Sequence, residues 1–218
     1  MSKIVIFDLD GTLTRRDTYI EFLLGYLKRC PMRLLRTIHL PFALLLYKSG
    51  WRDNSWLKEV FLNAILGDLH KTSLCQWIQD YTETLIRTGL RPGAIASLRQ
   101  HRQEGCLLIL ATASLDLYVE PLGKKLGYDD VICTRTAWTR DGRITGTLAN
   151  KNCYGREKLE RVKKWLGKTG ETQVDVVYSD HHSDLLLLLF AKLGVAVNPT
   201  PALKAAATQH QLSVVDWE

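Results

Sequence analysis

The chain has 218 residues, of which 46% are hydrophobic and 24% charged, a composition that excludes a disordered or fibrous protein. The length suits one large domain or one domain with an insertion. The formal net charge is +6, and the region from Arg15 to Arg52, with eight basic and two acidic residues, accounts for the whole excess. This region is either a solvated helix face or a surface that faces anions.

The N-terminal segment predicts a short buried strand. Ile4–Phe7 is an apolar run that leads directly to two carboxylates, Asp8 and Asp10. No apolar stretch of signal-peptide length precedes it, and the five cysteines are odd in number and scattered. We therefore expect a cytoplasmic protein with reduced thiols. A buried carboxylate needs a compensating partner, so these two acids predict a charged ligand or side chain nearby.

The next region predicts helices only. Residues 19–29, 32–47, 55–66 and 73–88 carry apolar side chains at helical spacing, and no strand pattern separates them. Residues 15–88 are therefore interpreted as a helical insertion, with 1–14 and 89–218 forming the core domain.

The remainder of the chain alternates between helices and short apolar strands. The predicted strands are 106–111, 131–134, 174–178 and 195–197, with a hairpin of 136–138 and 144–147 around the Asp141-Gly142 turn and a terminal helix and strand. The predicted helices begin near Pro92, Asp116, Gly155 and Asp184. This alternation predicts an α/β fold of three layers, in which helices cover both faces of a parallel sheet.

Polar residues follow several of these strands, at the edge where ligands bind in open α/β sheets. They are Asp8 and Asp10 after the first strand, Thr112 and Ser114 after the second, and Ser179, Asp180 and Asp184 after a later one. Four carboxylates at one edge repel one another unless a cation lies among them, and oxygen ligands suit Mg²⁺. With Lys158 nearby, the set is suited to phosphoryl transfer, with Asp8 as nucleophile and Asp10 as acid.

Four segments resemble the sequence motifs of the haloacid dehalogenase (HAD) superfamily, in the order in which the family has them. They are DLDGTL at 8–13, LILATAS at 108–114, CYGREK at 153–158 and YSDHHSD at 178–184. The pattern is similar to the phosphoserine-phosphatase-like branch, subfamily IB, and the motif layout also resembles its phosphatidylglycerophosphatase C-like members. The resemblance covers almost the whole chain.

The resemblance implies a Rossmann-like core with an inserted helical type 1 (C1) cap, and hydrolysis through an aspartyl-phosphate. In that scheme Asp8 attacks phosphorus, and Asp10 protonates the leaving oxygen and then activates water. Thr112 and Lys158 would bind phosphoryl oxygens. Mg²⁺ would be held by Asp8, the backbone carbonyl of Asp10, and Asp180, with Asp184 in support.

Several alternatives remain open at the sequence level. Lys151 and Arg156 lie close enough in sequence to compete with Lys158, and Ser179 stands where the family more often has glycine. Ser114 is expected either to act near the substrate or to cap the helix that begins at Asp116. The same intermediate also permits a phosphotransferase, and a non-catalytic binding relative is the remaining alternative.

The substrate class depends on residues 33–47. Thr37 to Tyr47 is a charge-free run of eleven residues, short of the ~20 needed to cross a bilayer. Basic residues at its border suit either peripheral contact with the inner, anionic face of a membrane or an internal cap helix. The substrate is accordingly a lipid phosphate such as phosphatidylglycerophosphate or a small phosphomonoester such as phosphoserine. We expect no nucleic-acid partner, because no reader motif accompanies the basic residues.

Overall fold

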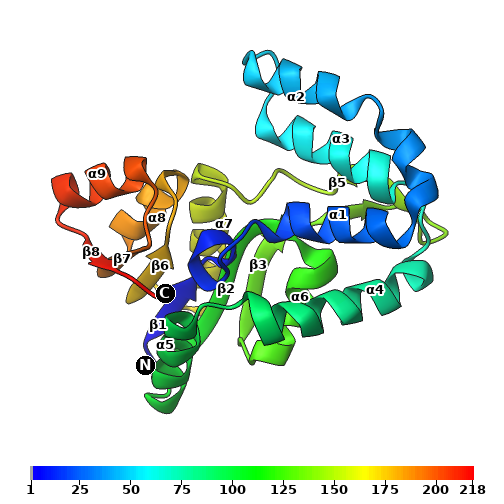
Figure 1. Cartoon of the computed structure of the whole chain (residues 1–218). Helices are drawn as coiled ribbons and strands as arrows, with labels where there is room; N and C mark the ends of the chain where they lie inside the picture. Colours follow the sequence, from blue (N-terminus) through cyan, green and yellow to red (C-terminus); the bar gives the residue numbers. More distant parts are fainter. Residues whose placement is uncertain (1) are drawn as a thin grey trace.

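The structure is a computed structural model that describes residues 2–218 (Figure 1). Its strands are β1 (Ile4–Phe7), β2 (Leu107–Leu115), β3 (Asp130–Thr134), β4 (Thr136–Trp138), β5 (Ile144–Leu148), β6 (Val176–Ser179), β7 (Leu193–Val197) and β8 (Ser213–Val215). Its α-helices are α1 (Thr18–Arg29), α2 (Leu40–Lys48), α3 (Asn54–Leu66), α4 (Lys71–Thr84), α5 (Pro92–Gln103), α6 (Asp116–Leu126), α7 (Arg156–Thr169), α8 (Leu185–Phe190) and α9 (Pro201–His210). Shorter helical turns are η1 (Leu9–Leu13), η2 (Pro31–Thr37), η3 (Leu85–Gly89) and η4 (His182–Asp184).

The central sheet has the strand order β3-β2-β1-β6-β7-β8, and every neighbouring pair is parallel. The predicted parallel α/β sheet is therefore confirmed. Because β1 lies between β2 and β6, the carboxyl ends of these three strands are neighbours. The hairpin of β4 and β5 forms a separate antiparallel pair, as expected from its Asp-Gly turn.

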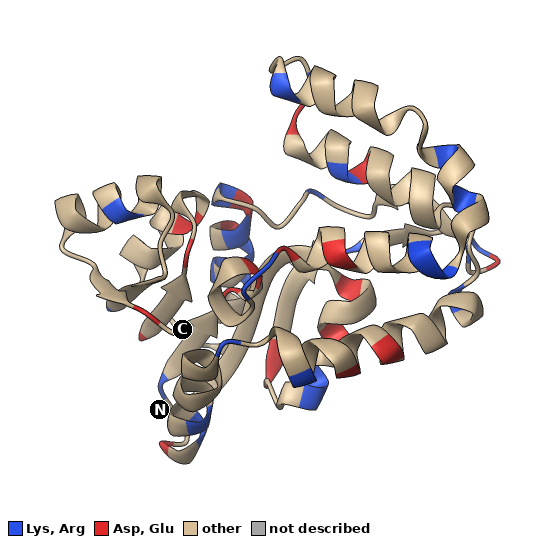
Figure 2. Cartoon of the chain, in the orientation of Figure 1, with Lys and Arg blue, Asp and Glu red and all other residues tan. Residues whose placement is uncertain are grey.

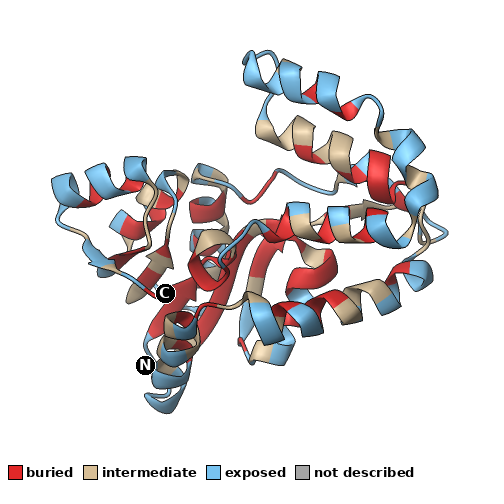
Figure 3. Cartoon of the chain, viewed as in Figure 1, coloured by how far each residue is buried: buried red, intermediate tan, exposed pale blue. Residues whose placement is uncertain are grey.

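Side chains alternate across β1 and thereby divide the core into two layers. Val5 and Phe7 pack with residues of α5 and α6 on one face, and Ile4 and Ile6 pack with residues of α7, α8 and α9 on the other. Both faces of the sheet are thus covered by helices, which explains why β1 is apolar throughout instead of alternating with polar residues. Figure 3 shows the sheet strands largely buried.

The helical region between β1 and α5 leaves and rejoins the sheet at one place. Thr14 and Leu90 form an isolated antiparallel bridge, and the backbone N–H of Arg91 donates to the carbonyl of Leu13 at 2.8 Å. The region packs on α6, where the rings of Phe22 and Tyr118 lie 4.7 Å apart between centroids. The same hydrophobic core therefore extends from the sheet into the helices.

One predicted helix differs in the structure. Residues 32–47 were expected to form one continuous helix, but the chain forms the 3₁₀ segment η2 and then starts α2 at Leu40. Pro41 occupies the first turn of α2, where its missing N–H has no helical partner to lose. At the same time, proline disfavours helical geometry in the residue before it, so a helix cannot run through this point undisturbed.

Candidate active site

The candidate site lies at the carboxyl ends of β1, β2 and β6. Asp8 follows β1 directly, Thr112 lies near the end of β2, and Asp180 follows β6. The backbone N–H of Asp8 donates to the carbonyl of Tyr178 at 3.0 Å, so β1 and β6 stay paired up to the point where the acids begin. Parallel strand order therefore brings together groups that are more than 100 residues apart in the sequence.

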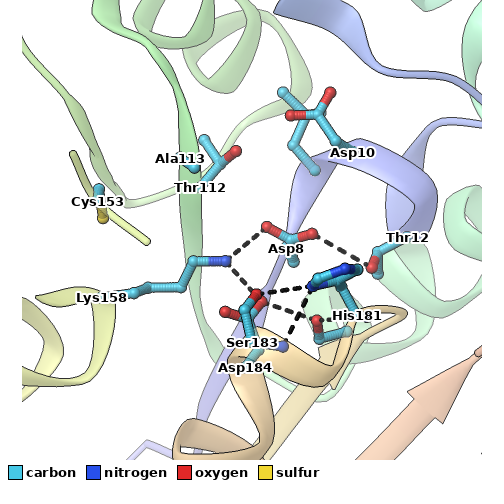
Figure 4. Close-up of polar contacts among 12 residues, drawn as sticks. Asp8, Asp10, Thr12, Thr112, Ala113, Cys153, Lys158, His181, Ser183 and Asp184 are labelled. Carbon is cyan, nitrogen blue, oxygen red and sulfur yellow. Dashed lines mark hydrogen bonds and ion pairs between the residues drawn. The ribbon is translucent and has the colours of Figure 1, made fainter. Parts of the chain in front are cut away.

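Lys158 pairs with two of the predicted carboxylates (Figure 4). Its Nζ donates to Asp8 Oδ1 at 2.8 Å and to Asp184 Oδ2 at 2.6 Å. All three side chains are buried. Burial alone would lower the pKa of Lys158, but the charges of Asp184 and Asp8 outweigh it and raise that pKa above its usual value. Lys158 is thus a permanent cation in the site.

The two competing basic residues do not reach this position. Lys151 and Arg156 are both exposed, whereas Lys158 is buried against Asp8. Lys158 lies in the first turn of α7, and the glycine before the helix, Gly155, has a φ of 58°, which turns the chain toward the site. Geometry therefore favours Lys158 among the three candidates.

Asp180 lies beside Asp8 without a basic partner. The hydroxyl of Thr12 bridges the two acids, at 3.5 Å from Asp8 Oδ2 and 3.2 Å from Asp180 Oδ1. Within residues 2–218, Asp180 takes part in no ion pair. Burial raises the pKa of Asp180 to about 6 and raises that of Asp8 well above its ordinary value, although Lys158 opposes the rise at Asp8. A further cation would stabilise the ionised form of both acids.

The Asp10 side chain points away from Lys158, which differs from the expected single cluster of four carboxylates (Figure 4). Its Oδ1 accepts hydrogen bonds of 2.6 Å from both the backbone N–H and the hydroxyl of Thr18, and its Oδ2 accepts one of 2.5 Å from the Ser114 hydroxyl. Burial and the charge of Asp17 raise the pKa of Asp10, and these hydrogen bonds partly offset the rise. Asp10 is thereby held as a carboxyl group with an increased tendency to carry a proton.

Two serine side chains have contacts that the sequence did not reveal. Ser114 is not the N-cap of α6, a position that Leu115 occupies; it donates to Asp10 instead. Ser179, which replaces the glycine more usual in the family, donates to Asp184 Oδ2 at 2.8 Å. No local sequence pattern predicts either contact. Asp10 is 104 residues from Ser114, and Asp184 is separated from Ser179 by a turn.

Lys58 is a further residue that sequence reasoning missed. It extends from α3 into the site, where its Nζ donates to the carbonyl of Ala113 at 2.6 Å and to Asn152 Oδ1 at 3.0 Å. No carboxylate pairs with it among residues 2–218, and burial lowers its pKa to about 8. A lysine at a helical position otherwise predicts a solvated side chain, so only the tertiary structure identifies it.

A cavity of about 530 Å³ connects these groups. Its inner end is polar and is lined by Asp8, Asp180 and Lys158, with Thr112 and Asp10 beside them. The helical region lines the cavity with apolar side chains, Ile20, Leu44, Tyr47, Leu57 and Phe61, and also with polar ones, Arg15, Arg16, Asp17, Asn54 and Lys58. The volume is in the range of small-molecule sites.

The residues present fit a divalent cation in three respects. The donors are carboxylate oxygens, which suit Mg²⁺. Asp184 Oδ1 is buried and has no hydrogen-bond partner in the described part of the chain. The absent Cβ of Gly11 leaves room for the Asp180 carboxylate, whose Oδ2 would lie only 2.2 Å from a Cβ there.

The carboxylates of the candidate site do not form a group of three whose ligand atoms all lie within 4.8 Å of one another. For residues 2–218, the one group of three metal-ligating side chains with that spacing is His101, Glu104 and Cys106. In the candidate site, Lys158 and Thr12 lie between the acids instead.

Gly11→Ala is expected to lower the enzymatic rate by tenfold or more, because the new methyl group displaces the Asp180 carboxylate. Its matched control is Gly105→Ala, since both glycines have a positive φ, 78° and 71°, but nothing lies within 4 Å of the added Cβ at Gly105. Both variants should lose about 1–2 kcal/mol of unfolding free energy from backbone strain. Equal rates in the two variants, measured beside urea denaturation, would contradict the assigned position of Asp180.

Comparison with known proteins gives a consistent picture. Residues 5–189 match the family model described as haloacid dehalogenase-like hydrolase. The chain is 31% identical over 188 residues to Protein CicA of Caulobacter vibrioides. This alignment covers 86% of the present chain and 82% of that protein. It is 25% identical over 224 residues to a histidinol-phosphatase of Neisseria meningitidis, with both chains covered completely.

A solved structure shows the same fold over its whole length. The protein of unknown function from Bordetella pertussis Tohama I aligns with a TM-score of 0.86 at 26% identity, and each chain is fully covered. These matches confirm the resemblance inferred from the four motifs and the α/β fold that it implied. The chain therefore belongs to the haloacid dehalogenase-like hydrolase family.

Proposed function

We propose that the chain hydrolyses a phosphomonoester through a phospho-aspartyl intermediate on Asp8. The observation that carries the proposal is the buried contact between Asp8 and Lys158, at the polar end of a cavity of about 530 Å³. A nucleophile with an adjacent cation in a largely desolvated site is what attack on a negatively charged phosphoryl group requires.

In the first step, a carboxylate oxygen of Asp8 forms a bond to phosphorus as the bond between phosphorus and the ester oxygen breaks. Asp10 donates a proton to that oxygen, and the alcohol leaves. Lys158 and the hydroxyl of Thr112 stabilise the charge on the phosphoryl oxygens. The raised pKa of Asp10 supports its role as the acid, because a proton donor must be protonated near the working pH.

In the second step, Asp10 takes a proton from water as the water oxygen attacks phosphorus. The bond between phosphorus and Asp8 breaks, and inorganic phosphate and the free carboxylate of Asp8 are released. Thr18 and Ser114 hold Asp10 in one orientation for both transfers, through the three hydrogen bonds that it accepts. They are positioning residues in this scheme.

Mg²⁺ is the proposed cofactor. Asp8, the backbone carbonyl of Asp10, and Asp180 would hold it, with Asp184 in support through its unpartnered oxygen. When bound, the ion supplies positive charge beside the phosphoryl group. It would also compensate Asp180, which has no basic partner among residues 2–218.

Mg²⁺ is expected to stabilise the fold more at pH 7.5 than at pH 5. The folded-state pKa of Asp180, about 6, lies above its ordinary value, so its contribution to stability is present at low pH and is lost as the pH rises through 6. Without metal, that loss should reach roughly 2–3 kcal/mol. Mg²⁺ binds the ionised form, so thermal unfolding with and without Mg²⁺ should separate most at the higher pH.

The control for this pH dependence is Asp180→Asn. Without this carboxylate, the effect of Mg²⁺ on the unfolding temperature at pH 7.5 should become small, and what remains should follow the titration of Asp8, whose pKa is also raised. A wild-type chain stabilised equally by Mg²⁺ at both pH values would exclude Asp180 as a ligand.

Residues 15–88 are proposed as the cap domain, and residues 1–14 and 89–218 as the catalytic core. The bridge between Thr14 and Leu90 supports this division, because the chain leaves and re-enters the core at neighbouring positions. The cap contributes Leu44, Leu57 and Phe61 to the cavity, while the reacting groups come from the core. Substrate choice would then be made largely by the cap.

Two substrate classes fit the cavity: a lipid phosphate, and a small phosphomonoester such as phosphoserine. The apolar lining from the cap favours the first, while the relative named as a histidinol-phosphatase adds histidinol phosphate to the second. The test is phosphate release from a panel of these esters, each with Mg²⁺ and with EDTA. Release that EDTA abolishes supports the proposal, and no Mg²⁺-dependent release from any ester in the panel would contradict it.

A phosphotransferase using the same intermediate is the second candidate, because the phosphoryl group on Asp8 can pass to an alcohol instead of water. Adding glycerol or ethanol to the same assay distinguishes them, since a transferase produces a new phosphate ester. A non-catalytic role is not favoured, because Asp8, Asp10 and Asp180 are all present.

A further inference from the structure

The outer face of η2 and α2 presents a row of large apolar side chains. Met32, Leu35, Ile38, Phe42 and Leu45 are each between 64% and 80% exposed. Met32 and Leu35 lie three residues apart on η2, Phe42 and Leu45 lie three apart on α2, and Ile38 lies between the two helices, so each helix presents one apolar row. We call these five residues the apolar ridge. Figure 3 shows α2 as mostly exposed.

This exposure does not result from poor packing of the segment. Leu40 and Ala43, on the inner side of α2, are buried, and Leu40 belongs to the core that α3 also lines. α2 is therefore anchored by one face while the other is exposed, and η2, which has no buried residue, is held by hydrogen bonds from Arg33 and Arg36 to backbone carbonyls at the end of α3. Trp51, in the turn after α2, is 81% exposed and extends the apolar surface. Apolar surface of this extent on a folded protein commonly marks an interaction site.

The segment that carries the ridge contains basic but no acidic residues, and the exposed Asp53 follows it directly. Residues 22–52 contain no Asp or Glu, and they include six basic residues: Lys28, Arg29, Arg33, Arg36, Lys48 and Arg52. Arg29 and Arg36 pair with acids outside the segment, whereas Lys28 and Lys48 take part in no ion pair within residues 2–218. Figure 2 shows no acidic residue along α2, a basic residue at its C-terminal end, and an acidic one in the turn that leads to α3.

These charges argue against a second copy of the chain as the occupant. A symmetric dimer through this face would place the same segment opposite itself, so that Lys48, which has no acidic partner among residues 2–218, would face a basic segment. An anionic surface is the complement of a basic border around an apolar ridge. Within residues 2–218, no helix combines the length and apolar character needed to cross a bilayer, so the contact would be with its surface.

We propose that the apolar ridge docks on an anionic lipid bilayer, with α2 lying in the plane of the interface. The ridge side chains enter the region between headgroups and acyl chains, and Lys28 and Lys48 contact the anionic headgroups. The inner side of the same helix contributes Leu44 and Tyr47 to the catalytic cavity. Docking therefore brings the apolar wall of the cavity close to the lipid.

Docking of α2 on a bilayer also suggests a substrate class, and this second step rests on the proposed function. A phosphomonoester lipid in the bilayer can place its phosphate at Asp8 while its apolar part lies along Leu44, Tyr47 and Phe61. The carboxylates and Lys158 would receive the phosphate of such an amphiphile, and the apolar side chains that the cap adds to the lining would contact its apolar part.

The first experiment measures binding of the full chain to vesicles by flotation. Vesicles of phosphatidylcholine with 30 mol % phosphatidylglycerol, a composition of about one anionic lipid in three, are compared with phosphatidylcholine alone. Wild type should bind the anionic vesicles at least about tenfold more tightly. The double variants Phe42→Gln/Leu45→Gln and Lys28→Gln/Lys48→Gln should each lose about tenfold or more of that affinity.

The matched control is Leu186→Gln/Leu189→Gln, which replaces two exposed leucines on α8, away from α2 (Figure 1). It should bind the vesicles like wild type. The three double variants should hydrolyse a soluble ester, p-nitrophenyl phosphate, at the wild-type rate, which shows that they are folded. Asp8→Asn should also bind like wild type, so docking is tested separately from catalysis.

Three outcomes would overturn docking: equal binding to both vesicle types, binding unaffected by the ridge variant, or a ridge-dependent dimer in sedimentation without vesicle binding. The substrate extension is tested with phosphatidic acid in the same vesicles. Its hydrolysis should fall about tenfold in the ridge variant while p-nitrophenyl phosphate hydrolysis is unchanged. If wild type hydrolyses only the soluble ester, the lipid is not the substrate, and the docking result stands on its own.

Discussion

Asp8→Asn is expected to lower the rate of phosphate release by at least about 10³-fold, the order of loss seen when a covalent nucleophile is removed. The amide of asparagine has nearly the same shape but does not attack phosphorus. The fold should survive, because Lys158 keeps its 2.6 Å contact with Asp184. The loss should therefore appear in the rate constant and not in the amount of folded protein.

The matched control for this variant is Asp141→Asn, in the exposed turn between β4 and β5. It makes the same chemical change at a residue that does not line the cavity and should keep the full rate. Incubation of the wild-type chain with a ³²P-labelled substrate should also leave transient label on the protein, which Asp8→Asn lacks. Wild-type turnover in Asp8→Asn would show that another group is the nucleophile.

Lys158→Met is expected to destabilise the chain by about 3–5 kcal/mol as well as inactivate it. Methionine retains the apolar stem of lysine but removes the ammonium group, leaving the buried carboxylates of Asp8 and Asp184 without a cation. Two like charges in a desolvated site repel each other at short range. Urea denaturation at pH 7.5 measures the loss, and Lys164→Met, at an exposed position of the same helix, serves as control.

The size of this destabilisation should depend on pH. The pKa of Asp8 is already raised by burial while Lys158 opposes the rise, so removing Lys158 raises it further. A folded chain with such a raised carboxyl pKa is most stable when that carboxyl is protonated. The loss of unfolding free energy in Lys158→Met should therefore shrink as the pH falls toward 5. The double variant Lys158→Met/Asp184→Asn should recover part of the stability at pH 7.5. Equal destabilisation at both pH values would mean that lost packing, not charge, is the cause.

The two variants also separate catalysis from stability. Asp8→Asn removes one charge from a paired site and leaves a compensated contact, whereas Lys158→Met removes the partner of two charges. Asp8, Lys158 and Asp184 thus affect the stability of the fold as well as the chemistry. Removing the cation from a buried group of charges leaves the remaining charges without compensation. A chain that folds well without Lys158 would argue against a desolvated site.

Much of the fold was predictable because it depends on local patterns. The apolar run Ile4–Phe7, the alternation after Pro92 and the Asp-Gly hairpin turn each specify an element without reference to the rest of the chain. The prediction failed for 32–47, where hydrophobic spacing suggested one helix but Pro41 interrupts it. Periodicity reports which face is apolar, while helix continuity depends on backbone hydrogen bonds that proline cannot make.

The candidate site divides in the same way. Asp8, Asp180 and Lys158 were identifiable from residue type and from their places after strands or at a helix start, because parallel strands bring such positions to one edge. Only the tertiary structure decided that Asp10 turns toward Thr18 and Ser114, that Lys58 enters the site, and that the apolar ridge is left uncovered. Side-chain orientation and exposure depend on neighbours distant in sequence, and residue order alone does not contain their positions.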